Sequence, residues 1–430
     1  MLSALLLAVL PVSPAAPAAI ATPAPLVEDA HGKLTWFQGT WAELLAEAKK
    51  THKPIFIDFW TTWCGWCKKL DKDTFSDASV VEAMKGVLCY SVDAEKSDPK
   101  AEMDGVRLAQ RFAARGYPYL VFTDASGELT DRISGYLPPA DFLREATRIL
   151  SGENTLGELR ARVGLEPANL FLRGDYMQRL LQYGDAEGAR REGAELRARI
   201  QRGEGFDPNS MYERWRASDL LRRSSDDAGA NAQLDAIRQM GERGVQWLAR
   251  RAALDSTIGV VNLAYQREKK LDPAPLVAYL AQETLPELLY EGWMARRNFE
   301  LFTASERRNQ QRPDDAKRAR AAARAAAAEV WKHAPERFKG DAARDLVTTW
   351  IGDAADLAEN EKKVLVDVAT WAALQFPADA ARHDLLGQAC ATLGHRDRAV
   401  AAFERALELA PSRLSTRKRL DDARALLQKQ

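Results

Sequence analysis

The sequence predicts two kinds of fold in one chain: an N-terminal α/β domain, with a central mixed sheet flanked by helices, and a long all-α helical-repeat region after it. Over residues 34–152, helix-like and strand-like segments alternate, which is typical of a sheet covered by helices. From residue 155 onward strand-like alternation is almost absent, and the helix formers Ala, Leu, Arg and Glu dominate. Near the C-terminus a helical pattern recurs at a spacing typical of repeat proteins.

The composition bounds the size and class of the protein. A chain of 430 residues is too long for one ordinary core, so we expect two or three domains. With 46% hydrophobic and 28% charged residues, the chain is typical of folded globular proteins. Lys plus Arg and Asp plus Glu both number 61, for a formal net charge of zero. This balance predicts neither a nucleic acid nor an anionic membrane as partner.

The N-terminus indicates export. Residues 2–10 form an apolar run, followed by small residues and prolines. The run is shorter than the about 20 apolar residues that span a bilayer, so it fits a secretory signal peptide. We expect residues 1–22 to be that signal peptide and the protein to be periplasmic or otherwise exported. The signal lacks a basic residue before the run, and the alternative is an uncleaved cytosolic tail.

The α/β domain is expected over residues 34–152. A first helix is predicted over residues 40–50, where apolar side chains recur at helical spacing after the N-cap Thr40. Residues 54–60 form an apolar run broken only by Asp58, which is typical of a strand buried on both faces. The elements expected next are a helix from residue 64, a helix over 78–85, a strand over 87–92, a helix over 104–114, strands over 119–123 and 129–134 joined by a turn at 124–127, and a helix over 140–150.

Cys64 and Cys67 follow the buried strand directly, where the next helix begins. Two cysteines three residues apart on the first turn of a helix are close enough to form a disulfide. The unpaired N–H groups and the positive dipole end at that position stabilise a thiolate, which is the attacking species in exchange. The sequence therefore predicts a redox pair in which Cys64 attacks and Cys67 resolves the mixed disulfide.

The residues around this pair resemble the active-site region of thioredoxin. Residues 56–60 and 63–68 match its strand and motif, and residues 116–118 resemble its segment with a cis proline facing the cysteines. The run 69–77 is closer still to the periplasmic C-terminal domain of the transmembrane thiol:disulfide interchange reductase. The resemblance covers residues 36–152, about a quarter of the chain.

The resemblance implies roles for single residues. Asp58 matches the buried aspartate that exchanges a proton with the resolving cysteine, because burial raises the pKa of a carboxyl group; the alternative is a purely structural aspartate. Pro118 matches the cis proline, which leaves the backbone of Tyr117 free to pair with an extended substrate. Tyr117 and Trp66 depart from the residues usual in thioredoxin. The residues expected to contact the substrate are Trp63, Gly65, Trp66, Tyr117 and Pro118.

Other chemistry is not expected. A single Cys-x-x-Cys motif supplies too few ligands for a zinc site, so we expect no metal and no cofactor. Cys89 lies in a predicted inner strand and Cys390 at a packing position of the repeat, so both are expected to be inert core residues. The tryptophans of the helical region are expected to be core residues as well; they are Trp215, Trp247, Trp293, Trp331, Trp350 and Trp371.

The helical region is expected as a domain over 155–345, tetratricopeptide-like repeats over 346–413 and a C-terminal capping helix over 414–430. In the last repeat, Gly387 and Ala399 are small where two helices cross, Gly394 occupies the turn, Phe403 fills the groove and Pro411 ends the second helix. The earlier helices fit degenerate repeats or generic helical hairpins. The stretches 203–209 and 307–315 are candidate linkers.

These patterns favour a thiol–disulfide oxidoreductase, with reduction of exported proteins as the expected direction. The expected partners are protein thiols and disulfides, and an unidentified protein on the helical repeats, because repeat arrays present extended binding surfaces. Two alternatives stay open. One is a disulfide oxidase or isomerase on the same fold, because the residues between the cysteines tune the redox potential. The other is a repeat scaffold whose N-terminal domain is only an adaptor.

Overall fold

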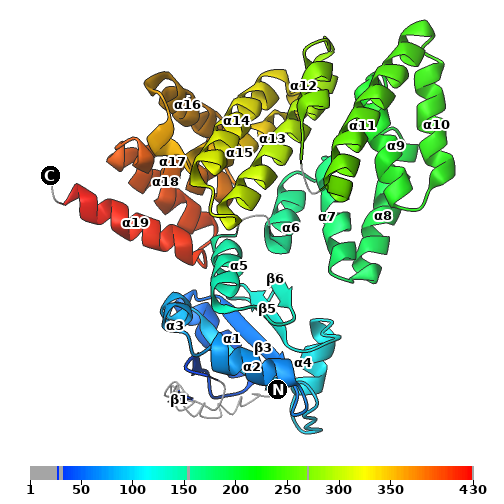
Figure 1. Cartoon of the computed structure of the whole chain (residues 1–430). Coiled ribbons are helices and arrows are strands. Elements are labelled where there is room, and N and C mark those ends of the chain that lie inside the picture. The colour runs from blue at the N-terminus through cyan, green and yellow to red at the C-terminus, as the bar shows by residue number, and fades with distance from the viewer. Residues whose placement is uncertain (1–26, 29–31, 153–154, 269–270, 429–430) are drawn as a thin grey trace, which may run out of the picture.

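The computed structural model describes residues 27–28, 32–152, 155–268 and 271–428. An α/β domain lies at one end of the molecule, and the helices of the remaining chain arch over one side of it (Figure 1). The predicted fold class is confirmed. The signal peptide expected over residues 1–22 lies outside the described residues. No helix in the described ranges combines the length and the apolar composition that a membrane span requires.

The α/β domain is built on a six-stranded mixed sheet in the order β1-β2-β4-β3-β5-β6. The strands are β1 (Val27–Glu28), β2 (Thr35–Trp36), β3 (Ile55–Trp60), β4 (Leu88–Asp93), β5 (Tyr119–Thr123) and β6 (Leu129–Ser134). Strands β2, β4 and β3 run parallel, while β5 and β6 are antiparallel to β3 and to each other. The predicted strands are all present. Strands β1 and β2 were not predicted, because two residues are too few to show an alternating pattern.

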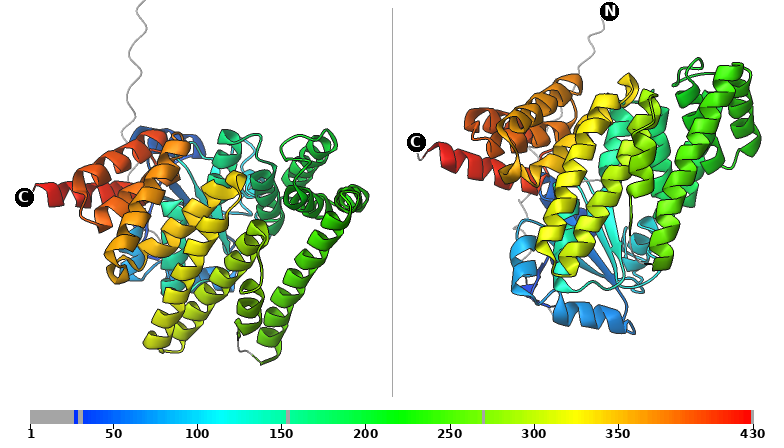
Figure 2. Two further views of the ribbon diagram at one scale, coloured as in Figure 1. Left: turned by 90° about the horizontal axis from the view of Figure 1, so that it is seen from above. Right: turned by 45° about the horizontal axis from the view of Figure 1, so that its top comes forward.

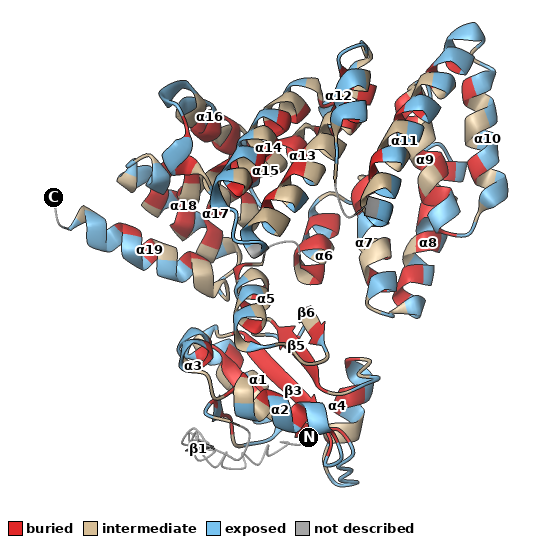
Figure 3. Ribbon diagram, in the orientation of Figure 1, coloured by how far each residue is buried: buried red, intermediate tan, exposed pale blue. Residues whose placement is uncertain are grey.

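Helices cover both faces of the sheet. One face packs against α1 (Trp41–Thr51) and α4 (Gly105–Arg111), and the other against α2 (Gly65–Asp73), α3 (Ala78–Met84) and α5 (Pro139–Ser151). Strands β3 and β5 are buried along their length between these layers (Figure 3). Successive side chains of a strand point to opposite faces. Because Phe56 packs on the α2, α3 and α5 side, Asp58 points to that same side.

The rest of the chain is helical wherever it is described, with no strand over 155–268 or 271–428. The helices are α6 (Leu156–Leu165), α7 (Leu170–Gln182), α8 (Ala186–Gln201), α9 (Met211–Arg223), α10 (Asp227–Arg238), α11 (Glu242–Glu268), α12 (Ala274–Leu280), α13 (Pro286–Asn309), α14 (Pro313–His333), α15 (Lys339–Ile351), α16 (Glu359–Gln375), α17 (Ala380–Thr392), α18 (Arg396–Leu409) and α19 (Leu414–Leu427). From α7 to α19 they stack into one continuous array (Figure 2). The six tryptophans expected in its core do contact it.

Helices α17 and α18 form the hairpin that the repeat pattern predicts. A Cβ atom added at Gly387 would lie 2.4 Å from the Phe403 ring, so only glycine lets the two helices approach this closely. Gly394 has a φ of +76° in the turn between them, a conformation that favours glycine. Ala399 and Phe403 are buried, and α18 ends at Leu409, before Pro411.

Two expectations about the helical region are wrong. The expected linker over 307–315 is a tight connection between the long helices α13 and α14, which pack along each other. The expected boundary between residues 345 and 346 falls inside α15. The two large cores of the helical region both draw on this helix, since Ala342 belongs to one and Ala343 to the other. The array therefore has no break there. The stretch 203–209 is the loop between α8 and α9.

Helices α6 and α19 both contact the α/β domain. Helix α6 packs on β6, and Leu129 at the start of β6 touches both the sheet core and the helical core. Helix α19 returns to α5, and Leu414 at its first turn packs on the α/β core. Helix α19 therefore does more than cap the array, because its N-terminal end also docks on the domain at the other end of the chain.

Candidate active site

Cys64 and Cys67 are joined by a disulfide bond, with their Cα atoms 5.3 Å apart. Each residue is only 3% exposed. Strand β3 ends at Trp60, a short turn follows, and α2 begins at Gly65. The two cysteines thus lie just beyond the C-terminal end of the central strand β3, on the first turn of α2.

The two sulfur atoms have different surroundings. Cys64 is the N-cap residue of α2, and its Sγ accepts a hydrogen bond of 3.1 Å from the backbone N–H of Cys67. An N–H donor and the positive end of the helix dipole both stabilise a negative charge on that sulfur. The thiolate is the nucleophile of disulfide exchange, so Cys64 occupies the position suited to the attacking residue.

The structure brings the other expected residues to this end of β3. The Tyr117–Pro118 peptide bond is cis, and Pro118 is buried immediately before β5. Asp58 lies in β3 with 1% exposure, on the face that α2 covers. Gly65 is open to solvent: of the described residues, none outside its immediate neighbours would lie within 4 Å of a Cβ atom added there.

Two tryptophans stand out from the surface beside the buried disulfide. Trp63 is 67% exposed and Trp66 is 59% exposed. The ring of Trp63 packs edge-on against Tyr117 at 6.1 Å, and its indole N–H donates to Glu95 at 3.0 Å. Burial, followed by the negative charges of Glu95 and Asp93, raises the pKa of Tyr117.

Sequence reasoning missed the residues around the second tryptophan. Trp66 packs on Tyr136 at 5.5 Å, and the Tyr136 hydroxyl donates to Asp73 at 3.2 Å. Lys69 lies 5.1 Å from the centre of the Tyr136 ring and forms a 2.6 Å ion pair with Asp73. The hydrogen bond from Lys69 lowers the pKa of Asp73. The sequence held one indication of Tyr136: it directly follows Gly135 at the end of a predicted strand, where loop residues can reach a site.

The remaining two cysteines are buried and unbonded. Burial raises the pKa of Cys89, in β4, to about 12. Burial also raises the pKa of Cys390, in α17. Both are core residues as expected. Within the described residues, no three His, Cys, Asp or Glu side chains gather closely enough to hold a metal ion.

Comparison with known proteins decides the family of this part of the chain. Residues 41–148 match the family described as the thioredoxin-like domain. Residues 41–148 are a thioredoxin-like domain. The thiol:disulfide interchange protein DsbD of Vibrio vulnificus is 32% identical over 107 residues, which is 24% of this chain and 17% of that protein. DsbD of Klebsiella pneumoniae is 33% identical over 102 residues, or 23% of this chain and 16% of that protein. The thioredoxin-like domain is thus similar in sequence to a part of the thiol:disulfide interchange proteins.

The chain spans about a sixth of the length of these curated relatives. Among solved structures, a putative disulphide-isomerase from Bacteroides thetaiotaomicron is 30% identical, covers 29% of this chain and 99% of its own, and gives a TM-score of 0.25. A solved tetratricopeptide domain is 13% identical, covers 67% of this chain and 96% of its own, and gives a TM-score of 0.22.

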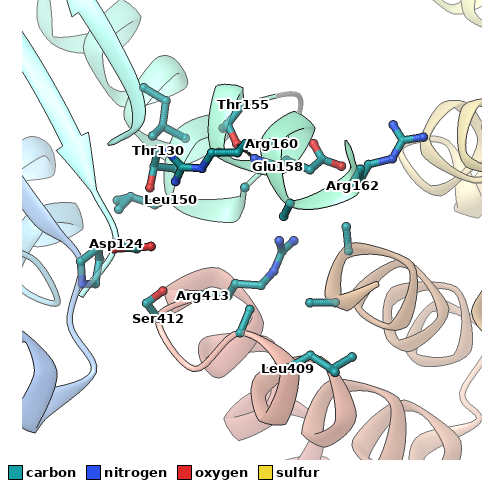
Figure 4. A pocket seen from close by; sticks show the side chains of 18 of the residues that line it. Asp124, Thr130, Leu150, Thr155, Glu158, Arg160, Arg162, Leu409, Ser412 and Arg413 are labelled. Atoms are coloured by element: carbon teal, nitrogen blue, oxygen red, sulfur yellow. Dashed lines mark hydrogen bonds between the residues drawn. The ribbon is translucent and has the colours of Figure 1, made fainter. Parts of the chain in front are cut away.

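A cavity of about 310 Å³ lies between the thioredoxin-like domain and the helical region. Glu158 and Arg160 on α6 face Ser412 and Arg413 on the α18–α19 turn across it (Figure 4). Arg160 forms an ion pair with Glu128 of the β5–β6 turn at 3.3 Å, and Arg413 lies 3.6 Å from Asp384. Both arginines thus pair with carboxylates outside the cavity lining, and we interpret the cavity as part of the interface between the two regions.

Proposed function

We propose that this protein is an exported thiol–disulfide oxidoreductase that reduces disulfides in other proteins. The observation that carries the proposal is the Cys64–Cys67 disulfide at the N-terminus of α2, with Cys64 as the N-cap residue. A buried aspartate and a cis proline lie beside it, and the domain is similar to thiol:disulfide interchange proteins. An adaptor domain has no need for all three features.

The reaction uses the dithiol form. The Cys64 thiolate attacks one sulfur of the substrate disulfide, forms a mixed disulfide and releases the first substrate thiolate, which takes up a proton. Asp58 accepts the proton of the Cys67 thiol, and the Cys67 thiolate attacks the Cys64 Sγ. The Cys64–Cys67 disulfide forms, and the second substrate thiol leaves with a proton. Two electrons pass from the protein to the substrate.

The direction of the reaction rests on the similarity to the interchange proteins and on Asp58, which assists deprotonation of Cys67. A disulfide oxidase or isomerase would use the same residues with a higher redox potential, so the potential separates these functions.

Two substitutions test the roles of the cysteines. Cys64→Ser removes the nucleophile and should abolish reduction of insulin by the protein in the presence of a chemical reductant. Cys67→Ser removes the resolving thiol and should accumulate a mixed disulfide with the substrate, visible by mass spectrometry. Full turnover by Cys67→Ser would show that the assigned roles are wrong. Cys89→Ser, at a buried core cysteine, is the matched control and should keep wild-type turnover.

The helical region is proposed to bind a protein partner. It presents an extended array of stacked helices, and large apolar side chains lie exposed on it, among them Val260 and Leu263 on α11 and Phe302 on α13. Stacked helical repeats use such surfaces to bind proteins or peptides.

A further inference from the structure

Two aromatic pairs join the tryptophans of the cysteine-bearing segment to tyrosines from separate parts of the chain. The first pair is Trp63 with Tyr117, and the second pair is Trp66 with Tyr136. Trp63 directly precedes Cys64, and Trp66 lies between the two cysteines in the sequence, at the start of α2. Tyr117 precedes the cis proline, and Tyr136 follows β6. Both tryptophans are more than half exposed, so each pair offers aromatic surface to a bound substrate.

Tyr136, the tyrosine of the second pair, is held in place by its neighbours. Tyr136 is half-buried against the sheet core and hydrogen-bonds Asp73, while Lys69 covers its ring. Its neighbours are also tied: the Gly135 N–H donates to the Pro118 carbonyl at 2.9 Å, and the Thr74 hydroxyl donates to the Leu137 carbonyl at 2.7 Å. A fixed aromatic surface loses little conformational entropy when a ligand binds.

One polar group of each pair is used within the protein, so a ligand meets fewer free polar atoms there. The indole N–H of Trp63 donates to Glu95, and the hydroxyl of Tyr136 donates to Asp73. The space beside the pairs is open. Of the described residues, none outside the immediate neighbours would come within 4 Å of a Cβ atom added at Gly65, Gly116 or Gly135.

We propose that Trp66 and Tyr136, together with the Trp63–Tyr117 pair, select cysteines that carry aromatic or large aliphatic residues on both sides in an extended or unfolded protein segment. This inference rests on the proposed function and names the substrate class of the same site. Side chains on either side of the reacting cysteine contact the two aromatic pairs, while the substrate sulfur meets the Cys64 Sγ. Small disulfides have no side chains that reach both pairs, so they react without this gain.

The test compares two disulfide-closed peptides of equal length and net charge. In one peptide Phe flanks each cysteine, and in the other Ser replaces every Phe. The full-length protein is reduced, freed of reductant and mixed with each peptide; acid quenching and chromatography then give the rate constant for peptide reduction. We expect the Phe peptide to react about tenfold faster than the Ser peptide, which is the scale of one or two aromatic contacts.

Substitutions assign this selectivity to the second pair. Trp66→Ala and Tyr136→Ala should each lower the Phe/Ser rate ratio from about ten to about three or less. Trp66→Phe and Tyr136→Phe keep an aromatic ring, so they should keep most of the Phe/Ser rate ratio. These two variants also test the inference if an alanine variant folds poorly. Leu374→Ala, which removes an exposed apolar side chain from α16, is the matched control and should change neither rate.

The outcomes separate this inference from the function it rests on. A wild-type ratio near one, or a ratio unaffected by both alanine substitutions, would overturn the selectivity and leave the oxidoreductase intact. Failure of the reduced wild-type protein to reduce either peptide would instead count against the oxidoreductase itself.

Discussion

The four cysteines occupy very different environments, and this difference sets their chemistry. Cys64 lies at a helix N-terminus beside open space at Gly65, whereas Cys89 is enclosed in the sheet, where burial raises its pKa to about 12. Disulfide exchange requires a thiolate. At pH 8, a thiol with a pKa near 12 is ionised to only about one part in 10⁴.

Thiol counting tests this contrast. After reduction, the native protein at pH 8 should react rapidly with a disulfide reagent at Cys64 and Cys67 only, and all four cysteines should react once the protein is unfolded. Because ionisation rises tenfold for each pH unit below the pKa, the native reaction of Cys89 should be slow at pH 8 and should speed up about tenfold for each pH unit above it. Labelling of Cys89 in the native protein as fast as Cys64 would contradict its buried environment.

Single residues of the site were predictable to different degrees. The Cys-x-x-Cys spacing and the cis proline belong to a contiguous motif and a short segment that resemble a known family, so sequence reasoning found them. Tyr136 and Glu95 reach the tryptophans from loops distant in sequence. Nothing local to Tyr136 says which side chain it meets, because that contact exists only after β6 and α2 pack on the same sheet.

At the scale of elements, the α17–α18 hairpin depends on a close helix crossing. An alanine at Gly387 would place a methyl group 2.4 Å from the Phe403 ring, so Phe403 or the helix must shift. We expect Gly387→Ala to lower the free energy of unfolding by about 1–3 kcal/mol, measured by urea unfolding followed by circular dichroism.

A second glycine provides the matched control. Gly259 lies inside α11, and of the described residues none would lie within 4 Å of an added Cβ atom there. Because alanine favours helix over glycine, Gly259→Ala should raise the free energy of unfolding by up to about 1 kcal/mol. Equal effects of the two substitutions would show that the close crossing at Gly387 contributes nothing.

Elements with strong periodicity were predicted well, and connections were not. The buried run of β3 and the amphipathic α1 and α5 carry their own signals. The Gln, Arg, Pro and Asp residues around the connection of α13 to α14 are residue types that also occur in flexible linkers. Only the packing of the two long helices shows that the connection is a hairpin turn. The shared role of α15 in two cores likewise depends on tertiary contacts.

At the scale of the whole molecule, the thioredoxin-like domain has two hydrophobic cores of its own, but residues of the helical region cover part of its surface. Leu414 packs on one of these cores, Leu129 touches the helical core, and Arg160 pairs with Glu128. A fragment ending at Gly152 retains both sheet cores and the Cys64–Cys67 pair, so we expect it to fold and to reduce hydroxyethyl disulfide at the full-length rate.

The fragment should nevertheless be less stable, because it exposes the surface that α6 and α19 cover. Its melting temperature should fall by several degrees, since about 1 kcal/mol corresponds to about 4–8 °C in a domain of this size. It should also fail to bind the partner proposed for the helical region. Aggregation, or loss of activity on the small disulfide, would show instead that the helices form an essential part of the redox domain.

The redox potential of the Cys64–Cys67 couple tests the proposed function most directly. The protein is equilibrated in glutathione and dithiothreitol buffers, and the fraction of dithiol is measured by trapping free thiols. A reductase should give a value near that of thioredoxin, about −270 mV. A value above about −150 mV, approaching the about −120 mV of a strong oxidase, would contradict reduction and favour disulfide formation.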